Sequence, residues 1–360
     1  RIIKGRLNQL GGDRESLSSF TNEVMVYFGR GVMMWELYIS PDILTSPEWD
    51  AIGLALRWAK ENANVLSTTK MILGNPLKRE PYGYVHAGSQ KAIVLLRNPF
   101  VEPASVTLRL DDAFSALSRS EEYAVTLTYP YNMILPGTVK FGEQVQIPME
   151  GYEVAVVELI PKQQLASELP TGVRYSTEGT RIRIFDEKGK TTQWQTVDGK
   201  KQETTFDLKH ESITAKETDF RRLAATKVLS TIELALPDSF AELNLGILFE
   251  PEKKLEGDDL PRFKFSVDGK EAQAVIDQEG GRWFWATLPL ESGSHKVEYV
   301  IESRQSVAGS VNSWLFAEQC LGEKEVERAL SVEGAMPLPR PYPPNSMAAS
   351  KKISSHSMTK

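Results

Sequence analysis

The hydrophobic pattern changes its period once, near residue 70, and this change limits the fold more than any other feature of the chain. Before it, Trp49, Ile52, Leu56 and Ala59 recur at spacings of three and four residues, which is typical of an amphipathic helix. After it, short apolar segments are separated by Gly, Pro and Asp, as in antiparallel sheets. These segments cover residues 91–97, 105–110, 123–129, 144–147 and 152–160. The pattern predicts a short α/β region followed by a long all-β region.

The α/β region covers residues 1–66. We expect a strand within residues 2–10, a helix over residues 17–28 that Gly29 ends, a strand over 32–39, and a helix over 48–64. The second strand is apolar on both faces, as in parallel sheets that helices cover. Thr45, Pro47 and Glu48 favour a helix start at this point. This order predicts the last βα units of a (β/α)8, or TIM, barrel. Because the chain opens on Arg1, we expect the other strands of that barrel to lie upstream.

Two β domains are predicted after the barrel segment. Residues 67–162 have the strand spacing of a small antiparallel β-sandwich, and residues 161–170 resemble a linker. Residues 172–320 predict a second, jelly-roll-like β-sandwich. Its hairpin signals are Asp198-Gly199, Asp268-Gly269 and Gly280-Gly281, and the first two share a Val-Asp-Gly-Lys segment that could mark a repeat. Residues 334–360 are rich in Pro and then in Ser, Met and Lys, so we expect a disordered tail there.

The composition excludes several classes of protein. With 360 residues, 41% of them hydrophobic and 25% charged, the chain is expected to form two or three globular domains. A formal net charge of -6 without a basic stripe argues against a nucleic-acid partner. No apolar stretch is long enough to predict a membrane span. The single Cys320 rules out an internal disulfide and a cysteine metal cluster.

Several short motifs, in this order, resemble a known enzyme family. They are residues 27–42, the helix that carries Trp49 and Trp58, residues 82–86, and the Leu96-Arg97-Asn98-Pro99 turn. Together they resemble the C-terminal part of α-galactosidase-like (β/α)8-barrel glycoside hydrolases, over roughly residues 20 to 160. In that family the eighth strand and helix close the barrel and an antiparallel β domain follows.

The resemblance implies that the catalytic groups are two Asp residues at the ends of the fourth and sixth barrel strands. Those strands would lie upstream of Arg1. A retaining glycosidase needs two carboxyl groups about 5 Å apart, and this chain offers no such pair by resemblance. We therefore assign no catalytic residue, expect the chain to be inactive alone, and expect no cofactor. The implied partner is a carbohydrate substrate with an α-linkage.

Four residues are candidates for substrate contact. Glu36 and Tyr38 stand near the end of the predicted strand, where barrel enzymes place functional groups. Trp35 could stack on a sugar ring, but strand alternation allows only Trp35 or the Glu36 and Tyr38 pair to face the barrel interior. Asp42 follows in the next loop. The structural alternatives are an ion pair for Glu36, packing under the helices for Trp35 and a turn or cap for Asp42.

The remaining candidates are His and Trp residues. His86, His210, His295 and His356 have no metal-like spacing, so no metal site is expected. In residues 283–285, Trp283 and Trp285 would lie on one face of a strand and Phe284 on the other. Such a pair of indoles suits binding to a polysaccharide, although packing in the sandwich core is the favoured interpretation. We expect the same of Trp194 and Trp314.

Two functions other than a glycoside hydrolase fragment stay open. The domain over 172–320 could be a non-catalytic carbohydrate-binding module, or the whole chain could be a structural β-sandwich surface protein. We expect an extracellular or periplasmic location, while the oligomeric state stays undetermined.

Overall fold

The computed structural model describes residues 2–4, 16–31, 34–39, 41–178, 181–186, 191–206, 211–305, 307–326 and 346–358. The chain is mainly β and divides into two compact units. The first contains residues 1–209 and 321–347, and the second contains residues 210–320 and 348–360. No helix in the described part has the length and apolar character needed to cross a membrane.

The first unit begins with a βαβα segment. Its elements are β1 (Ile2–Lys4), α1 (Leu17–Gly29), β2 (Leu37–Ile39), the 3-10 turn η2 (Pro41–Ile43), α2 (Ser46–Glu61) and α3 (Ala63–Leu66). β1 and β2 pair in parallel, with Ile3 opposite Tyr38. The predicted helices are confirmed within three residues at each end. The second strand is shorter than predicted, because residues 34–36 precede β2 without pairing.

A nine-stranded sheet forms the centre of this unit, in the order β15-β14-β11-β8-β7-β10-β5-β4-β3. The bounds along the chain are β3 (Lys70–Leu73), β4 (Tyr82–Ala87), β5 (Ala92–Arg97), β7 (Tyr123–Tyr129), β8 (Met133–Ile134), β10 (Val154–Pro161), β11 (Pro170–Thr171), β14 (Thr192–Thr196) and β15 (Lys201–Thr204). A two-stranded sheet of β6 (Ala104–Arg109) and β9 (Gln144–Met149) shares a hydrophobic core with it. Short 3-10 turns lie at η3 (Pro76–Lys78), η4 (Asp112–Phe114) and η5 (Lys162–Gln164).

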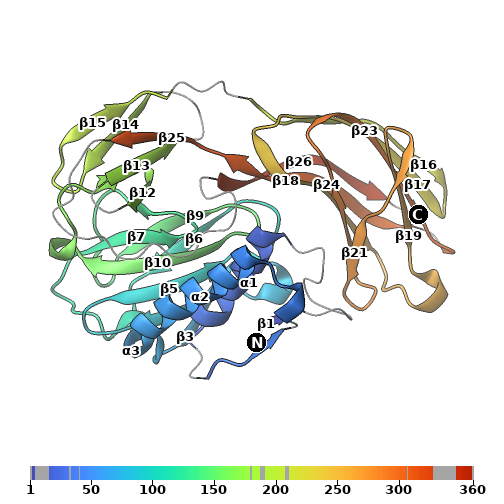
Figure 1. Cartoon of the computed structure of the whole chain (residues 1–360). Coiled ribbons are helices and arrows are strands. Elements are labelled where there is room, and N and C mark those ends of the chain that lie inside the picture. The colour runs from blue at the N-terminus through green and yellow to red at the C-terminus, as the bar shows by residue number, and fades with distance from the viewer. Residues whose placement is uncertain are drawn as a thin grey trace. The chain divides into compact units, whose positions relative to one another are not determined.

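Strands β5 and β10 are buried on both faces. Val94 and Leu96 belong to the core shared with β6 and β9, while Ile93 and Leu95 pack against α1 and α2 on the other face. Figure 1 shows the two helices lying over this part of the sheet. Full burial explains why residues 92–96 form an unbroken apolar run instead of alternating.

The Asn98-Pro99 turn that contributed to the family resemblance holds the end of β5. The Asn98 side chain is buried and donates hydrogen bonds from Nδ2 to the carbonyl oxygens of Glu102 and Glu150, at 2.8 and 2.9 Å. Its Oδ1 accepts a bond from the Phe100 N–H. An amide is needed here because the site requires both a donor and an acceptor.

The predicted boundary between the two β domains is corrected. Residues 170–206 belong to the first unit, because β11 pairs with β8 and β14 and thereby continues the nine-stranded sheet. A separate sheet of β12 (Arg174–Glu178), β13 (Arg181–Asp186) and β25 (Gly322–Val326) belongs to the same unit. Trp194 lies in a small core with Ile182 and Ile184, as expected for a packing residue.

The second unit is a sandwich of two five-stranded antiparallel sheets. One has the order β16-β17-β23-β19-β20 and the other β21-β22-β18-β24-β26. Their bounds are β16 (Thr214–Ala224), β17 (Lys227–Leu236), β18 (Phe240–Pro251), β19 (Arg262–Val267), β20 (Lys270–Ala272), β21 (Val275–Gln278), β22 (Phe284–Pro289), β23 (Gly293–Glu302), β24 (Gly309–Cys320) and β26 (Ser346–Met358), with a 3-10 turn η6 (Gly257–Asp259). Apolar residues from both sheets form its core.

The two Val-Asp-Gly-Lys segments do not form a repeated unit. Asp268 and Gly269 make a two-residue turn between β19 and β20, with φ values of 52° and 78°. Asp198 and Gly199 connect β14 to β15 in the first unit. The predicted hairpins are therefore present, but they lie in different domains.

The prediction of a disordered tail over 334–360 is corrected for its second half. Ser346–Met358 form β26, an edge strand that lies beside β24. Met358 is buried in the sandwich core, and Ile353 packs against it. A polar sequence can form an ordered edge strand because tertiary contacts override its weak intrinsic preference. Residues 334–345, 359 and 360 lie outside the described residues.

Candidate functional site

The predicted substrate-contact residues lie on one stretch of chain between α1 and α2. Trp35 packs with Leu37 and Ile39 against the helical core, and its ring meets Phe28 edge to face at 5.5 Å. Its Nε1 is buried without a hydrogen-bond partner among the described residues. Trp35 thus serves as packing under the helices, which was the structural alternative for this residue.

Glu36 follows Trp35 directly in the same stretch. Its side chain is exposed, while its carbonyl oxygen accepts a 2.7 Å hydrogen bond from Tyr27 Oη of helix α1. That bond anchors the backbone just before β2. Trp35 packs on the helices, whereas the Glu36 side chain is exposed.

Tyr38 and Asp42 follow in β2 and in the turn after it. Tyr38 pairs with Ile3 across the parallel ladder, and its side chain lies outside the described residues. Asp42 is exposed in η2. Glu36, Tyr38 and Asp42 thus follow one another in the segment that precedes α2.

Helix α2 begins where the sequence predicts. The Glu48 carboxylate is buried and accepts bonds from the Thr45 N–H and Oγ1 at 2.7 and 2.9 Å. This capping box, with Pro47 in the first turn, fixes the loop that carries Asp42.

His86 takes a structural position in strand β4. The ring is fully buried, with Nε2 2.8 Å from the carbonyl oxygen of Gly29 and Nδ1 3.1 Å from Thr69 Oγ1. Burial lowers the pKa of His86 below its usual value, and the backbone bond to Gly29 opposes this. Nε2 therefore donates to the end of helix α1. Among the described residues, no group of three His, Cys, Asp or Glu side chains could hold a metal ion.

The aromatic residues of β22 are divided between two faces. Phe284 is in the sandwich core, whereas Trp285 and Trp283, which precedes the strand, are half-buried and lie outside that core. Trp285 meets Trp314 at 5.6 Å and Phe316 at 6.2 Å. Neither indole belongs to the sandwich core that the sequence favoured, whereas Trp314, of which the same was expected, is 2% exposed.

Gly246 of β18 makes room for this aromatic cluster. A Cβ atom there would lie 2.4 Å from Trp285 Cζ2 and 3.1 Å from Phe316 Cε1. The Trp285 indole thus lies directly against the backbone of β18, and its Nε1 donates to Thr287 Oγ1 at 2.9 Å. Trp314 is 2% exposed and Lys352 Nζ lies 5.3 Å from the centre of its ring, so the cluster is partly covered.

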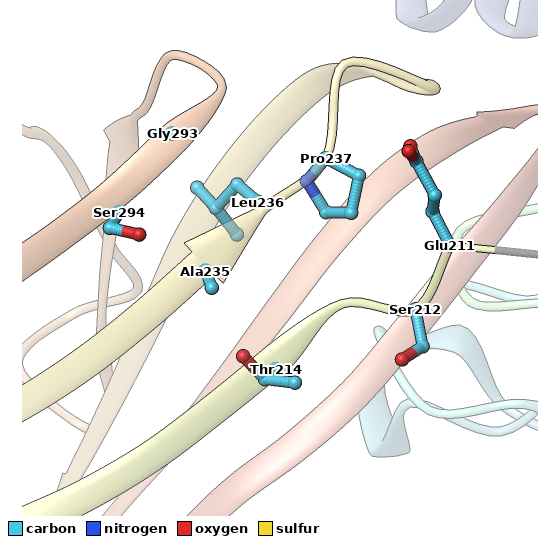
Figure 2. Close-up of a pocket in the computed structure, with 8 residues that line it drawn as sticks. All are labelled: Glu211, Ser212, Thr214, Ala235, Leu236, Pro237, Gly293 and Ser294. Atoms are coloured by element: carbon cyan, nitrogen blue, oxygen red, sulfur yellow. The ribbon is translucent and has the colours of Figure 1, made fainter.

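A shallow groove of about 420 Å³ lies at one end of the second unit. Figure 2 shows that residues preceding and opening β16, the end of β17 and the start of β23 line it. The lining residues include Glu211, Ser212, Leu236, Pro237 and Ser294, without an aromatic ring. The groove contains none of the residues predicted from the sequence, and nothing in its lining selects a sugar.

One polar cluster in the second unit was not predicted from the sequence. Glu217 of β16 and His356 of β26 meet at 2.5 Å, and Ser230 and Ser354 donate to the same carboxylate. Because both hydroxyls donate to Glu217 and not to His356, this is not a Ser–His nucleophile pair. The signal was hidden in the polar tail, where Ser354, His356 and Met358 alternate.

Comparison with known proteins gives matches to solved structures alone. No protein-family model and no curated protein matches the chain. Among solved structures, it is similar to α-galactosidase I from Mortierella vinacea, with 12% identity over 41% of this chain and 36% of that chain, at a TM-score of 0.30. A putative α-N-acetylgalactosaminidase from Bacillus halodurans matches with 12% identity over 41% and 32%, at a TM-score of 0.29. The chain thus spans about a third of each.

A collagen adhesin from S. aureus is also similar, with 12% identity over 76% of this chain and 93% of that chain, at a TM-score of 0.19. The similar structures thus include glycoside hydrolases and a collagen adhesin. At TM-scores below 0.5 we draw no conclusion from them about function.

Proposed function

We propose that this chain is the C-terminal part of a glycoside hydrolase that acts on α-linked glycosides, and that residues 1–66 complete its (β/α)8 barrel. The observation that carries this proposal is the parallel β1–α1–β2–α2 segment. Its helices pack against the β domain, and the Glu36 side chain just before β2 is exposed. In a barrel, functional side chains stand at the C-terminal ends of the strands.

The role proposed for Glu36, Tyr38 and Asp42 is to form part of the pocket wall. A carboxylate that accepts hydrogen bonds from sugar hydroxyls contributes to substrate affinity without taking part in bond cleavage. The catalytic Asp pair is proposed to lie upstream, and the enzyme is proposed to act outside the cytoplasm.

The reading frame upstream of Arg1 tests the class of enzyme. It should encode further βα units with two Asp residues at strand ends. A stop codon directly upstream would contradict the proposal.

Substitution of Glu36 tests the site. In the complete protein, Glu36→Gln should raise the KM for an aryl α-galactoside about tenfold with a smaller change in kcat, because ground-state binding is lost. Asp50→Asn is the matched control, since Asp50 is exposed on α2. Equal kinetics for Glu36→Gln and the wild type would remove Glu36 from the site.

A second candidate function is carbohydrate binding by the second unit. It is favoured by the partial exposure of Trp283 and Trp285, since indole faces stack on sugar rings. Trp285→Ala should weaken retention on a polysaccharide affinity gel roughly tenfold. Leu223→Ala is the control, because Leu223 is an exposed apolar residue of the other sheet. Unchanged retention in both variants, or none in the wild type, would reject this function.

A further inference from the structure

Strand β26 closes one edge of the second unit. β16 is the edge strand of one sheet and β26 is the edge strand of the other. Side chains from both edges meet between the sheets, where Glu217 contacts His356 and Ser354. The contact joins two segments that lie 139 residues apart in the sequence.

Glu217 is the centre of this contact. Its side chain is 10% exposed, and its Oε2 lies 2.5 Å from His356 Nε2. Its Oε1 accepts bonds from Ser230 Oγ at 2.5 Å and Ser354 Oγ at 3.2 Å. Two of these three partners come from β26. Burying a carboxylate costs free energy unless it is paired and hydrogen-bonded. Glu217 therefore needs the two partners that β26 supplies.

The unit also presents surfaces that fit the shape of the strand. The His356 ring stacks on Phe220 at 3.6 Å with planes 3° apart. Ser313, which is fully buried on β24, shares a 2.6 Å hydrogen bond with Ser354. Hydroxyl, imidazole and apolar side chains at 354, 356 and 358 therefore each meet a matching group.

Successive side chains of β26 face opposite sides of the strand, so Ser355 does not take part in the contact with Glu217. Ser355 points the other way and donates to Asn312 Oδ1 at 2.6 Å. Ser354 and Ser355 thus provide a matched pair, one inside the groove and one outside it.

We propose that the groove between β16 and β24, which is different from the groove lined by Glu211 and Leu236, is a binding site for an extended peptide strand. In this chain β26 fills the groove, and β26 of a second copy of the chain can occupy it instead. Residues 327–345, which join β25 to β26, number 19 and can span up to about 60 Å when extended. This reach allows the strand to leave its own groove and enter another. Strand addition supplies main-chain hydrogen bonds, and alternate side chains supply specificity. The second copy carries the matching pattern because the sequence is the same.

A labelled synthetic peptide with the sequence of residues 346–358 tests the groove in the full-length chain. The wild-type chain should bind it weakly, because its own strand competes. Ser354→Ala combined with His356→Ala in the chain should raise the apparent affinity at least about tenfold, since the groove is vacant for a larger fraction of the time. Ser355→Ala is the control and should bind the peptide like the wild type.

The specificity of binding is tested in the same assay. Adding Glu217→Gln to the double variant should abolish the gain. A peptide that itself carries Ser354→Ala and His356→Ala should bind at least tenfold more weakly. Equal binding of both peptides, or no gain in the double variant, would overturn the proposal.

Sedimentation of the wild-type chain tests exchange between copies without any substitution. Dimers should accumulate as the chain concentration rises, and an excess of the free peptide should reduce them. A chain that stays monomeric at all concentrations would contradict exchange between copies. Dimers that the peptide does not reduce would show association through another surface and would also overturn it.

Discussion

At the scale of single residues, Gly31 and His86 join the end of helix α1 to the sheet. Gly31 has a φ of 75°, and a Cβ atom there would lie 2.5 Å from His86 Cε1 and 2.1 Å from Thr69 Oγ1. Glycine is thus required both by the backbone conformation and by the space. The sequence shows the glycine and the histidine, but 55 positions separate them, so only the fold reveals their contact.

The burial of His86 predicts a pH dependence of stability. Because its folded pKa lies below the ordinary value near 6.5, its neutral form stabilises the fold above that pH. This contribution should be lost as the pH falls below about 6.5, by at most about 1.4 kcal/mol per pH unit. Urea unfolding of the first unit between pH 7.5 and 5 should show the loss in the wild type.

His86→Gln provides the comparison. Its free energy of unfolding should be lower at pH 7.5 but should change less with pH. Identical pH slopes for the two proteins would show that His86 does not titrate on unfolding in this range.

At the scale of elements, the helices were predicted well because their signals are local. Thr45, Pro47 and Glu48 lie within four residues, and the structure shows the capping box that they predict. Strand β2 was predicted too long, since pairing depends on a neighbouring strand and not on the apolar run alone. Trp35 illustrates the consequence, because it packs on the helices outside any ladder.

The cap of α2 gives a prediction at this scale. Thr45→Ala should lower the free energy of unfolding by about 1 kcal/mol, because Glu48 loses the hydroxyl that donates to it. Ser46→Ala is the control, since Ser46 is exposed at the start of the helix. Chemical denaturation of both variants compares the two costs, and equal costs would contradict the role of the cap.

At the scale of the whole molecule, the chain passes from the first unit to the second, returns to the first once, and ends in the second. Residues 321–347 lie with the first unit and residues 348–360 with the second. Domains predicted from the sequence are contiguous segments. Residues 172–206 were therefore predicted in the second β domain, although they belong to the first unit, and β26 was predicted to lie outside the sandwich.

Deletion of residues 346–360 tests the place of β26. If this segment completes the second unit, its loss should lower the melting temperature of that unit by several degrees, while the transition of the first unit changes less. The expected cause is the loss of buried Met358 and the partners of Glu217. Differential scanning calorimetry of the full-length and shortened chains measures this. An unchanged thermogram would support a disordered tail.

The amino-acid sequence by itself determined the mainly β class, the first two helices with their ends and the hairpin turns, because each depends on residues that are close along the chain. The tertiary structure alone decided which strands share a sheet, which face Trp35 and Trp285 occupy, and that His356 meets Glu217. These outcomes depend on burial and pairing between distant segments. The segment around β2 illustrates both points: its apolar run was visible in the sequence, but the packing of Trp35 on the helices depends on the fold.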